Sequence, residues 1–341
     1  MKENLEIELN KQISEFGKDS RIKECFHFEK KLCSDKIISA HSIQNNKVLN
    51  LLESEVNGNL KVLSFLYLKH NKFGKVISLK PIGKKSASTF FGFCNYHDTN
   101  IFKEIENNEI DLNNDKHCFL LSYRAFAKDY HAKKETLKGY KKNKFYSITH
   151  KLLGLNLAEG SEIGLRDSSF VKKRLNKIFE KKQFDELYYL TYELDYLIPI
   201  ALSGSFNPNY SYKGKKLNKS SDINIIYEFV NFVIHPTTSG KTLIILSCLP
   251  EHEKSVLFLD ELDELKTLKF EKAVSSLAIA YIENTFISPI LWEKLGVIGQ
   301  ETLLNEIENT NPMNRGQYKG FFHSEINFFD LKFKKTAPNT V

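Results

Sequence analysis

The stretch ASTFFGFCNYHDTNIFKEIE, residues 87–106, joins an aromatic run to an apparent helix through side chains that can carry chemistry. Cys94, His97 and Asp98 lie close together directly after Gly92 and Phe93. The C-x2-H spacing lets the cysteine and the histidine of a tight turn reach one ion, and the glycine permits that turn. This stretch therefore predicts half of a metal site.

A tetrahedral zinc site requires four ligands, so two more must come from elsewhere in the chain. Cys25 and Cys33 are the best candidates, although their separation is wider than in the common zinc knuckle, and His27 is an alternative to Cys33. We predict a structural Zn²⁺ held by Cys25, Cys33, Cys94 and His97. Its binding energy would support the folding of residues 21–115.

His41 ends a β-like run and precedes a helix-like run in KIISAHSIQNNKVLNLL, residues 36–52. Together with the cysteines and the Cys94-x2-His97-Asp98 pattern, this order resembles the treble-clef, zinc-supported branch of the HNH (ββα-metal) nucleases. It also resembles an uncharacterised bacterial group that shares an AHSIQ…ASTF-GFC-x2-HD signature. The resemblance covers roughly residues 21–130 and implies a ββα fold for that region.

The resemblance implies that His41 is a general base that activates water for attack on a phosphodiester. A divalent ion such as Mg²⁺ would stabilise the charge that develops on the phosphate. The acidic ligand that usually precedes the histidine is replaced by Ala40, and Asp98 is the residue that could hold the ion instead.

Three further polar residues could complete such a site. Asn46 or Asn50 could orient the histidine, and the spacing does not select between them. Glu106 could supply the missing carboxylate if its helix turns it inward, whereas a solvated helix position would leave it without a role.

The composition is that of a folded protein, because hydrophobic residues make up 41% and charged residues 27% of its 341 residues. No apolar run approaches the ~20 residues of a membrane span, and the N-terminus has no signal-peptide pattern, so we expect a cytoplasmic protein without membrane association. The net charge of +7 is compatible with nucleic acid as a partner. Cys118 and Cys248 lie in apolar runs and are expected to be buried.

The sequence predicts an α+β protein in four parts: an N-terminal helix over 1–20, the zinc-supported treble-clef/ββα module over 21–115, a helical segment over 116–185, and an α+β domain over 186–341. In the module, LKVLSFLYL and KVISL are expected to be strands around a turn at NKFGK. Helical periodicity is found over 117–139 and again over 168–182. The latter segment carries a basic face that consists of Lys172, Lys173, Arg174, Lys177, Lys181 and Lys182.

The last part is expected to contain an antiparallel sheet with a covering helix, preceded by an exposed loop over 207–222. INIIYEFVNFVIH and TLIILSCLP predict a hairpin around PTTSGK, and SVLFLDEL is also strand-like. A long helix over 269–295, interrupted near Pro289, is expected to follow. HPTTSGKT is not a phosphate loop, because His235 stands where the first glycine is needed and a strand follows.

Two functions are consistent with these patterns. The first is a metal-dependent, HNH-like nuclease that cleaves nucleic acid, with a role in antiviral defence or as a toxin by analogy with where such modules occur. The alternative is a non-catalytic zinc module that binds nucleic acid or a protein partner, in which Ala40 marks a lost metal site.

Overall fold

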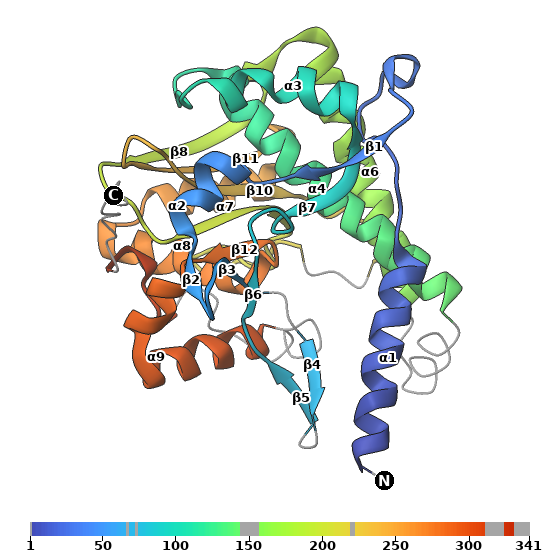
Figure 1. Ribbon diagram of the computed structural model, residues 1–341. Coiled ribbons are helices and arrows are strands. Elements are labelled where there is room, and N and C mark those ends of the chain that lie inside the picture. Colours follow the sequence, from blue (N-terminus) through green and yellow to red (C-terminus); the bar gives the residue numbers. More distant parts are fainter. Residues whose placement is uncertain are drawn as a thin grey trace, which may run out of the picture.

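The computed structural model describes residues 2–65, 68–71, 74–143, 157–218, 222–310 and 324–330. Helices cover both faces of a large antiparallel sheet, and smaller two-stranded sheets lie outside it (Figure 1). Every strand pairing in these ranges is antiparallel. This mixture of helices and antiparallel sheets agrees with the predicted α+β class.

The large sheet draws its strands from both halves of the chain. In spatial order they are β2 (Ser54–Val56), β3 (Asn59–Ser64), β12 (Thr285–Ile287), β9 (Ile200–Phe206), β10 (Val230–Pro236), β11 (Thr242–Cys248) and β8 (Tyr188–Leu194), with β6 (Lys80–Ile82) also paired to β3. Phe286 of β12 is opposite Ser64 of β3 on one side and Ala201 of β9 on the other. One sheet therefore combines strands from residues 21–115 with strands from residues 186–341.

The central strands β9, β10 and β11 are buried along their whole length. Side chains alternate between the two faces of a strand, so a strand with two buried faces must be covered twice. On β10, Phe232 and Ile234 belong to one hydrophobic core, whereas Val233 belongs to the other.

The first face of the sheet is covered by the C-terminal helices α7 (Glu253–Asp263), α8 (Thr267–Tyr281) and α9 (Pro289–Asn309), and by the 3-10 helix Phe328–Asp330. The prediction that SVLFLDEL is strand-like was wrong, because this segment lies in α7. Its buried residues Phe258, Leu259 and Leu262 recur at the spacing of a helix.

The prediction of one long helix over 269–295 was also wrong in part. Strand β12 separates α8 from α9, since Thr285, Phe286 and Ile287 are buried between two neighbouring strands. Helix α9 then begins at Pro289, where the missing N–H of proline costs nothing, and Ser288 caps it by accepting from the N–H of Ile290.

The second face is covered by α4 (Asp115–Lys142) and α6 (Leu157–Lys181), which confirms the helices predicted over 117–139 and 168–182. The predicted N-terminal helix is α1 (Lys2–Ser20), and its Phe16 ring lies 5.3 Å from the ring of Tyr140 on α4. Cys118 and Cys248 are buried, as predicted.

Strand β1 (Ile37–His41) pairs with β7 (Thr89–Cys94), and helix α3 (Asn95–Asn107) follows β7 directly. This ββα unit lies beside α4, at the opposite end of the picture from the β4 (Leu68–Asn71) and β5 (Gly74–Ile77) hairpin (Figure 1). Strand β5 overlaps the predicted KVISL, whereas most of the predicted LKVLSFLYL forms β3 of the large sheet and only Leu68 lies in β4. Residues 66–67 and 72–73 lie outside the described part. Between β1 and β2 the chain forms a π-helical turn (Asn45–Leu49) and the short α2 (Asn50–Leu52).

The hairpin of β10 and β11 is confirmed, and Thr242 begins a strand instead of the helix that a phosphate loop would need. The first of its two strands is shorter than predicted, because β10 begins only at Val230.

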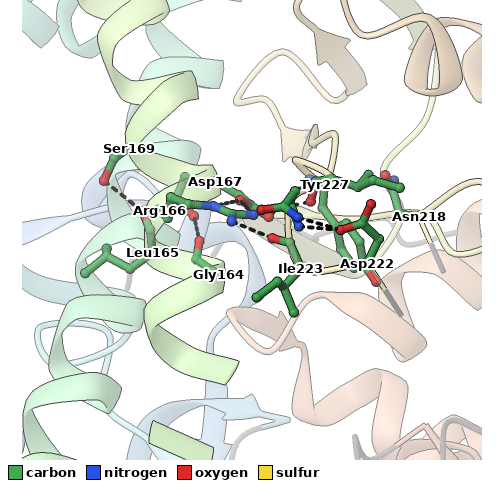
Figure 2. Close-up of polar contacts among 12 residues, drawn as sticks. Gly164, Leu165, Arg166, Asp167, Ser169, Asn218, Asp222, Ile223 and Tyr227 are labelled. Carbon is green, nitrogen blue, oxygen red and sulfur yellow. Dashed lines mark hydrogen bonds and ion pairs between the residues drawn. The ribbon is translucent and has the colours of Figure 1, made fainter. Parts of the chain in front are cut away.

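Residues 223–229 were predicted to belong to the strand, but polar contacts with α6 hold this segment away from the sheet (Figure 2). Arg166 of α6 donates to the carbonyls of Ile223 and Ile225 at 2.5 and 3.3 Å. The buried Asp167 carboxylate accepts from the N–H of Tyr227 at 3.1 Å and from Arg166 Nε at 2.8 Å. These bonds hold the segment against α6 and away from the sheet.

Among the helices of the described ranges, none combines the length and the apolar character needed to cross a membrane.

The Asp167 contacts predict a measurable contribution to stability. Replacing Asp167 with alanine removes the acceptor of the Tyr227 N–H and the carboxylate partner of Arg166, which keeps its bonds to the carbonyls of Ile223 and Ile225. The free energy of unfolding should therefore fall by about 1–3 kcal/mol. Glu162 also lies on α6, and Glu162→Ala removes its exposed ion pair with Lys141 of α4. This change should cost about 0–1 kcal/mol. Urea denaturation of both variants measures the difference, and equal losses would contradict a special role for Asp167.

Candidate metal centre

The junction of β7 and α3 supplies two of the four candidate zinc ligands. Cys94 is the last residue of β7 and the N-cap of α3, where its Sγ accepts from the N–H of His97 at 3.4 Å. His97 lies in the first turn of the helix and is buried. The change from strand to helix thus turns both side chains toward one point, as the C-x2-H spacing predicts.

The other two ligands come from the segment before β1. This segment is extended beside β7, with the N–H of Glu24 donating to the carbonyl of Phe91 at 3.1 Å and that of Phe26 donating to Gly92 at 2.6 Å. These bonds place the buried Cys25 beside Cys94. Cys33 follows the 3-10 turn Lys30–Leu32 and is only half-buried.

The four side chains converge on His97. Its Nδ1 lies 3.4 Å from the Sγ of Cys25, 3.5 Å from that of Cys33 and 3.2 Å from that of Cys94. All four ligand atoms lie within 4.8 Å of one another. A tetrahedral zinc with ordinary bond lengths would separate a nitrogen and a sulfur ligand by about 3.5 Å. The cluster of Cys25, Cys33, Cys94 and His97 could therefore hold a zinc ion.

His27, the sequence-based alternative to Cys33, lies beside this cluster in a second group with Glu29 and His97. Its ring centroid is 4.4 Å from that of His97. The hydroxyl of Tyr123 donates to Asn176 Oδ1 at 2.8 Å and so can accept from His27 Nδ1, which is 3.2 Å away. Burial lowers the pKa of His27 to about 3, so this ring is neutral. It packs against the ring of His97 beside the four candidate ligands.

Burial disfavours the thiolate forms of the three cysteines. Burial, together with the neighbouring Cys25, raises the pKa of Cys33 to about 12. Burial opposes ionisation of Cys94 as well, but hydrogen bonds from the backbone N–H groups of His97 and Ser34 lower its pKa overall. A zinc ion would pair with the thiolates and offset the cost of burying them.

His41 lies outside this cluster, at the end of β1 opposite Thr89. Its Nδ1 is 3.0 Å from the carbonyl oxygen of Ala87, which can only accept, so Nδ1 carries the proton and Nε2 is left with its lone pair. Burial lowers the pKa of His41 below its ordinary value of 6.5, and the charge of Arg124 lowers it further. The ring is half-buried and neutral at pH 7.

Asp98, predicted as a ligand for a catalytic ion, lies one residue beyond His97. Its Oδ1 is buried without a hydrogen-bond partner, and burial raises the pKa of this carboxyl. No hydrogen bond or ion pair among the described residues joins Asp98 to His41. Both residues instead share two charged neighbours, Arg124 and Glu106.

Glu106 lies on the last turn of α3, where its side chain is 41% exposed and forms an ion pair with Arg124. Its Oε1 accepts from Nη1 of Arg124 at 2.6 Å, and the guanidinium lies 3.9 Å above the ring of Phe102. The residue that orients His41 is Ala87 through its carbonyl, a role that the resemblance gave to Asn46 or Asn50. Sequence reasoning missed Arg124, although a cation within the apolar stretch CFLLSYRAF is itself a signal.

These contacts do not form a site for a catalytic divalent ion. In the part of the chain that the structure describes, the groups with three or more possible ligands both contain His97, and neither includes His41 or Asp98. The carboxylate of Glu106 is bound to Arg124, and Ala40 offers no ligand. Asp98 alone remains, beside a guanidinium that repels a cation.

Comparisons with protein-family models, curated proteins and solved structures gave no match to this chain.

The metal centre can be tested by exchanging single cysteines. Cys94→Ser should lose the zinc that copurifies with the wild-type chain and lower its melting temperature, because binding energy at this site is folding energy. Cys248→Ala, which removes a buried thiol of the large sheet, should keep one zinc per chain. Elemental analysis measures the metal. If Cys33→Ala retains zinc while His27→Ala loses it, the fourth ligand is His27.

Proposed function

We propose that this protein is a nuclease of the HNH-like type, in which a zinc-supported ββα unit of treble-clef character presents His41 as the general base. The observation that carries the proposal is the Ala87 carbonyl at 3.0 Å from Nδ1, because it leaves Nε2 as the proton acceptor of a half-buried ring. A base of this kind must be neutral at the working pH, and the lowered pKa of His41 meets that requirement.

The proposed zinc would have a structural role: it ties the segment around Cys25 and Cys33 to the junction of β7 and α3. The residues of the ββα unit carry out the remaining tasks. Strand β7 pairs with β1 and fixes the backbone of His41, and Ser88 lies 3.4 Å from the same Nδ1. With its tautomer fixed, His41 can take a proton from a hydroxyl that a bound phosphodiester presents to Nε2.

The pH dependence of cleavage tests this role. Since only neutral His41 accepts a proton, kcat/KM should rise with pH through an apparent pKa below 6.5 and then reach a plateau. His41→Ala should lower the plateau by roughly 10²–10⁴-fold, the usual value of general-base catalysis, and should keep its zinc.

His117→Gln, which changes another buried imidazole, should keep the wild-type profile. Loss of zinc from His41→Ala would make His41 a structural residue. A wild-type chain that cleaves neither DNA nor RNA would rule out the nuclease.

The basic face of α6 favours a second candidate, a non-catalytic module that binds nucleic acid. Four of its lysines are exposed and have no ion pair within the described ranges: Lys173, Lys177, Lys181 and Lys182. The other two cations are engaged, because Lys172 lies over the rings of Phe26 and Tyr130 and Arg174 binds Glu251. Ala40, buried at the position of the usual acidic ligand, also fits a module without catalysis.

Salt dependence separates a phosphate contact from a solvated surface. If Lys173, Lys177 and Lys181 contact phosphates, their joint replacement by glutamine should reduce the slope of log K against log salt by about 2–3 for nucleic acid. Replacing Lys254, Lys269 and Lys272, which lie on α7 and α8, provides the control. An unchanged slope would mean that the face of α6 does not bind phosphate.

A further inference from the structure

We infer that Arg124 takes the place of the divalent ion at this site, and that the substrate is RNA, cleaved by its own 2′-hydroxyl without a catalytic metal. This inference rests on the proposed role of His41 as general base. It adds the group that stabilises charge and the chemical class of the substrate.

The guanidinium of Arg124 is held in a fixed position. Arg124 is only 3% exposed, stacks on Phe102 and donates Nη1 to Glu106 at 2.6 Å. From that position its positive charge acts on His41 and Asp98, and also on His235 of strand β10. The charge of this fixed guanidinium thus reaches the proposed base, His41.

Arg124 has hydrogen-bonding capacity that the described residues do not use. Its Nε is buried and has no hydrogen-bond partner among the described residues, although a guanidinium offers five N–H donors in a fork that fits phosphate. Glu106, its partner, has a side chain that is 41% exposed. If the Glu106 carboxylate moves away, Nη1 of Arg124 becomes free as well, and a phosphate would then receive two N–H donors from this buried guanidinium.

The residues near His41 offer few free ligands to a divalent ion. A divalent ion needs carboxylates that are free, whereas Glu106 is already paired and the acidic position before His41 is the buried Ala40. Lys47 adds a second positive charge near His235. The carboxyls of Glu106 and Asp98 balance these two positive charges, so the group left to receive a phosphate is the Nε of Arg124.

Without an ion to activate water, the nucleophile must come from the substrate. The 2′-hydroxyl of RNA is held next to the phosphate, and this proximity replaces an unfavourable bimolecular encounter. Nε2 of His41 takes the proton of the 2′-hydroxyl, the 2′-oxygen bonds to phosphorus, and the bond from phosphorus to the 5′-oxygen breaks. The 5′-oxygen takes a proton from solvent, which leaves a 2′,3′-cyclic phosphate and a 5′-hydroxyl. Arg124 stabilises the additional negative charge on the phosphate oxygens.

The test uses the full zinc-containing chain and a 5′-labelled RNA oligonucleotide, with no added divalent cation. Wild type should cleave it to 2′,3′-cyclic phosphate ends. The same oligonucleotide with one 2′-deoxyribose at the cleavage position should be resistant there. Arg124→Ala should lower kcat by roughly 10²–10³-fold, the usual loss for one donor to a developing oxyanion, and Arg124→Lys should recover part of it.

Lys213→Ala removes a cation that is also paired to a carboxylate at 2.6 Å and should cleave at the wild-type rate. Melting temperature and zinc content identify any variant that fails to fold. If Arg124→Ala is such a variant, the kcat of Arg124→Lys is compared with that of the wild type instead. Cleavage that requires added Mg²⁺, occurs at the 2′-deoxy position or leaves 5′-phosphate ends would overturn the inference but keep His41 as the base of a nuclease. Absence of cleavage of both RNA and DNA would instead overturn the proposed function.

Discussion

The convergence of three thiols and one imidazole within 4.8 Å is the constraint on which the N-terminal part of this structure depends. Cys25 and Cys94 are buried, and thiolates packed so closely repel one another unless a cation lies between them. The cluster joins the segment before β1 to the junction of β7 and α3. Because β1 pairs with β7, the position of His41 is fixed by the same junction.

Helix α4 connects this cluster with the surroundings of His41 through two adjacent residues. Successive side chains on a helix point about 100° apart, so Tyr123 and Arg124 reach different neighbours. The hydroxyl of Tyr123 lies 3.2 Å from His27, next to the metal ligands, and Arg124 binds Glu106 on the last turn of α3. The helix thus carries the support of the metal cluster and the only guanidinium described near His41.

The candidate metal ligands could be predicted, the distant Cys25 and Cys33 included, because a zinc site requires four ligands of residue types that are rare in this chain, whereas most contacts between distant polar residues could not. The Cys94-x2-His97 pair is set within one turn, and the helices α4 and α6 follow from local periodicity. By contrast, Arg124 binds Glu106, which is 18 positions away on another helix. The N–H of Tyr227 donates to Asp167, which is 60 positions away. The run around Phe258 was misread because a short apolar segment fits both a strand and a helix.

The placement of β12 between β3 and β9 has a consequence for the order in which the protein can assemble during synthesis. Asn284, directly before β12, donates to Ser42 across 242 positions of the chain. Until residues 285–287 leave the ribosome, one edge of β3 has no partner strand, and an open edge is a template for pairing with other chains. The candidate metal cluster is complete once residue 97 has emerged, so the nascent chain can bind its ion long before its sheet is closed. Nascent chains that stop before β12 are therefore expected to hold metal and yet to aggregate.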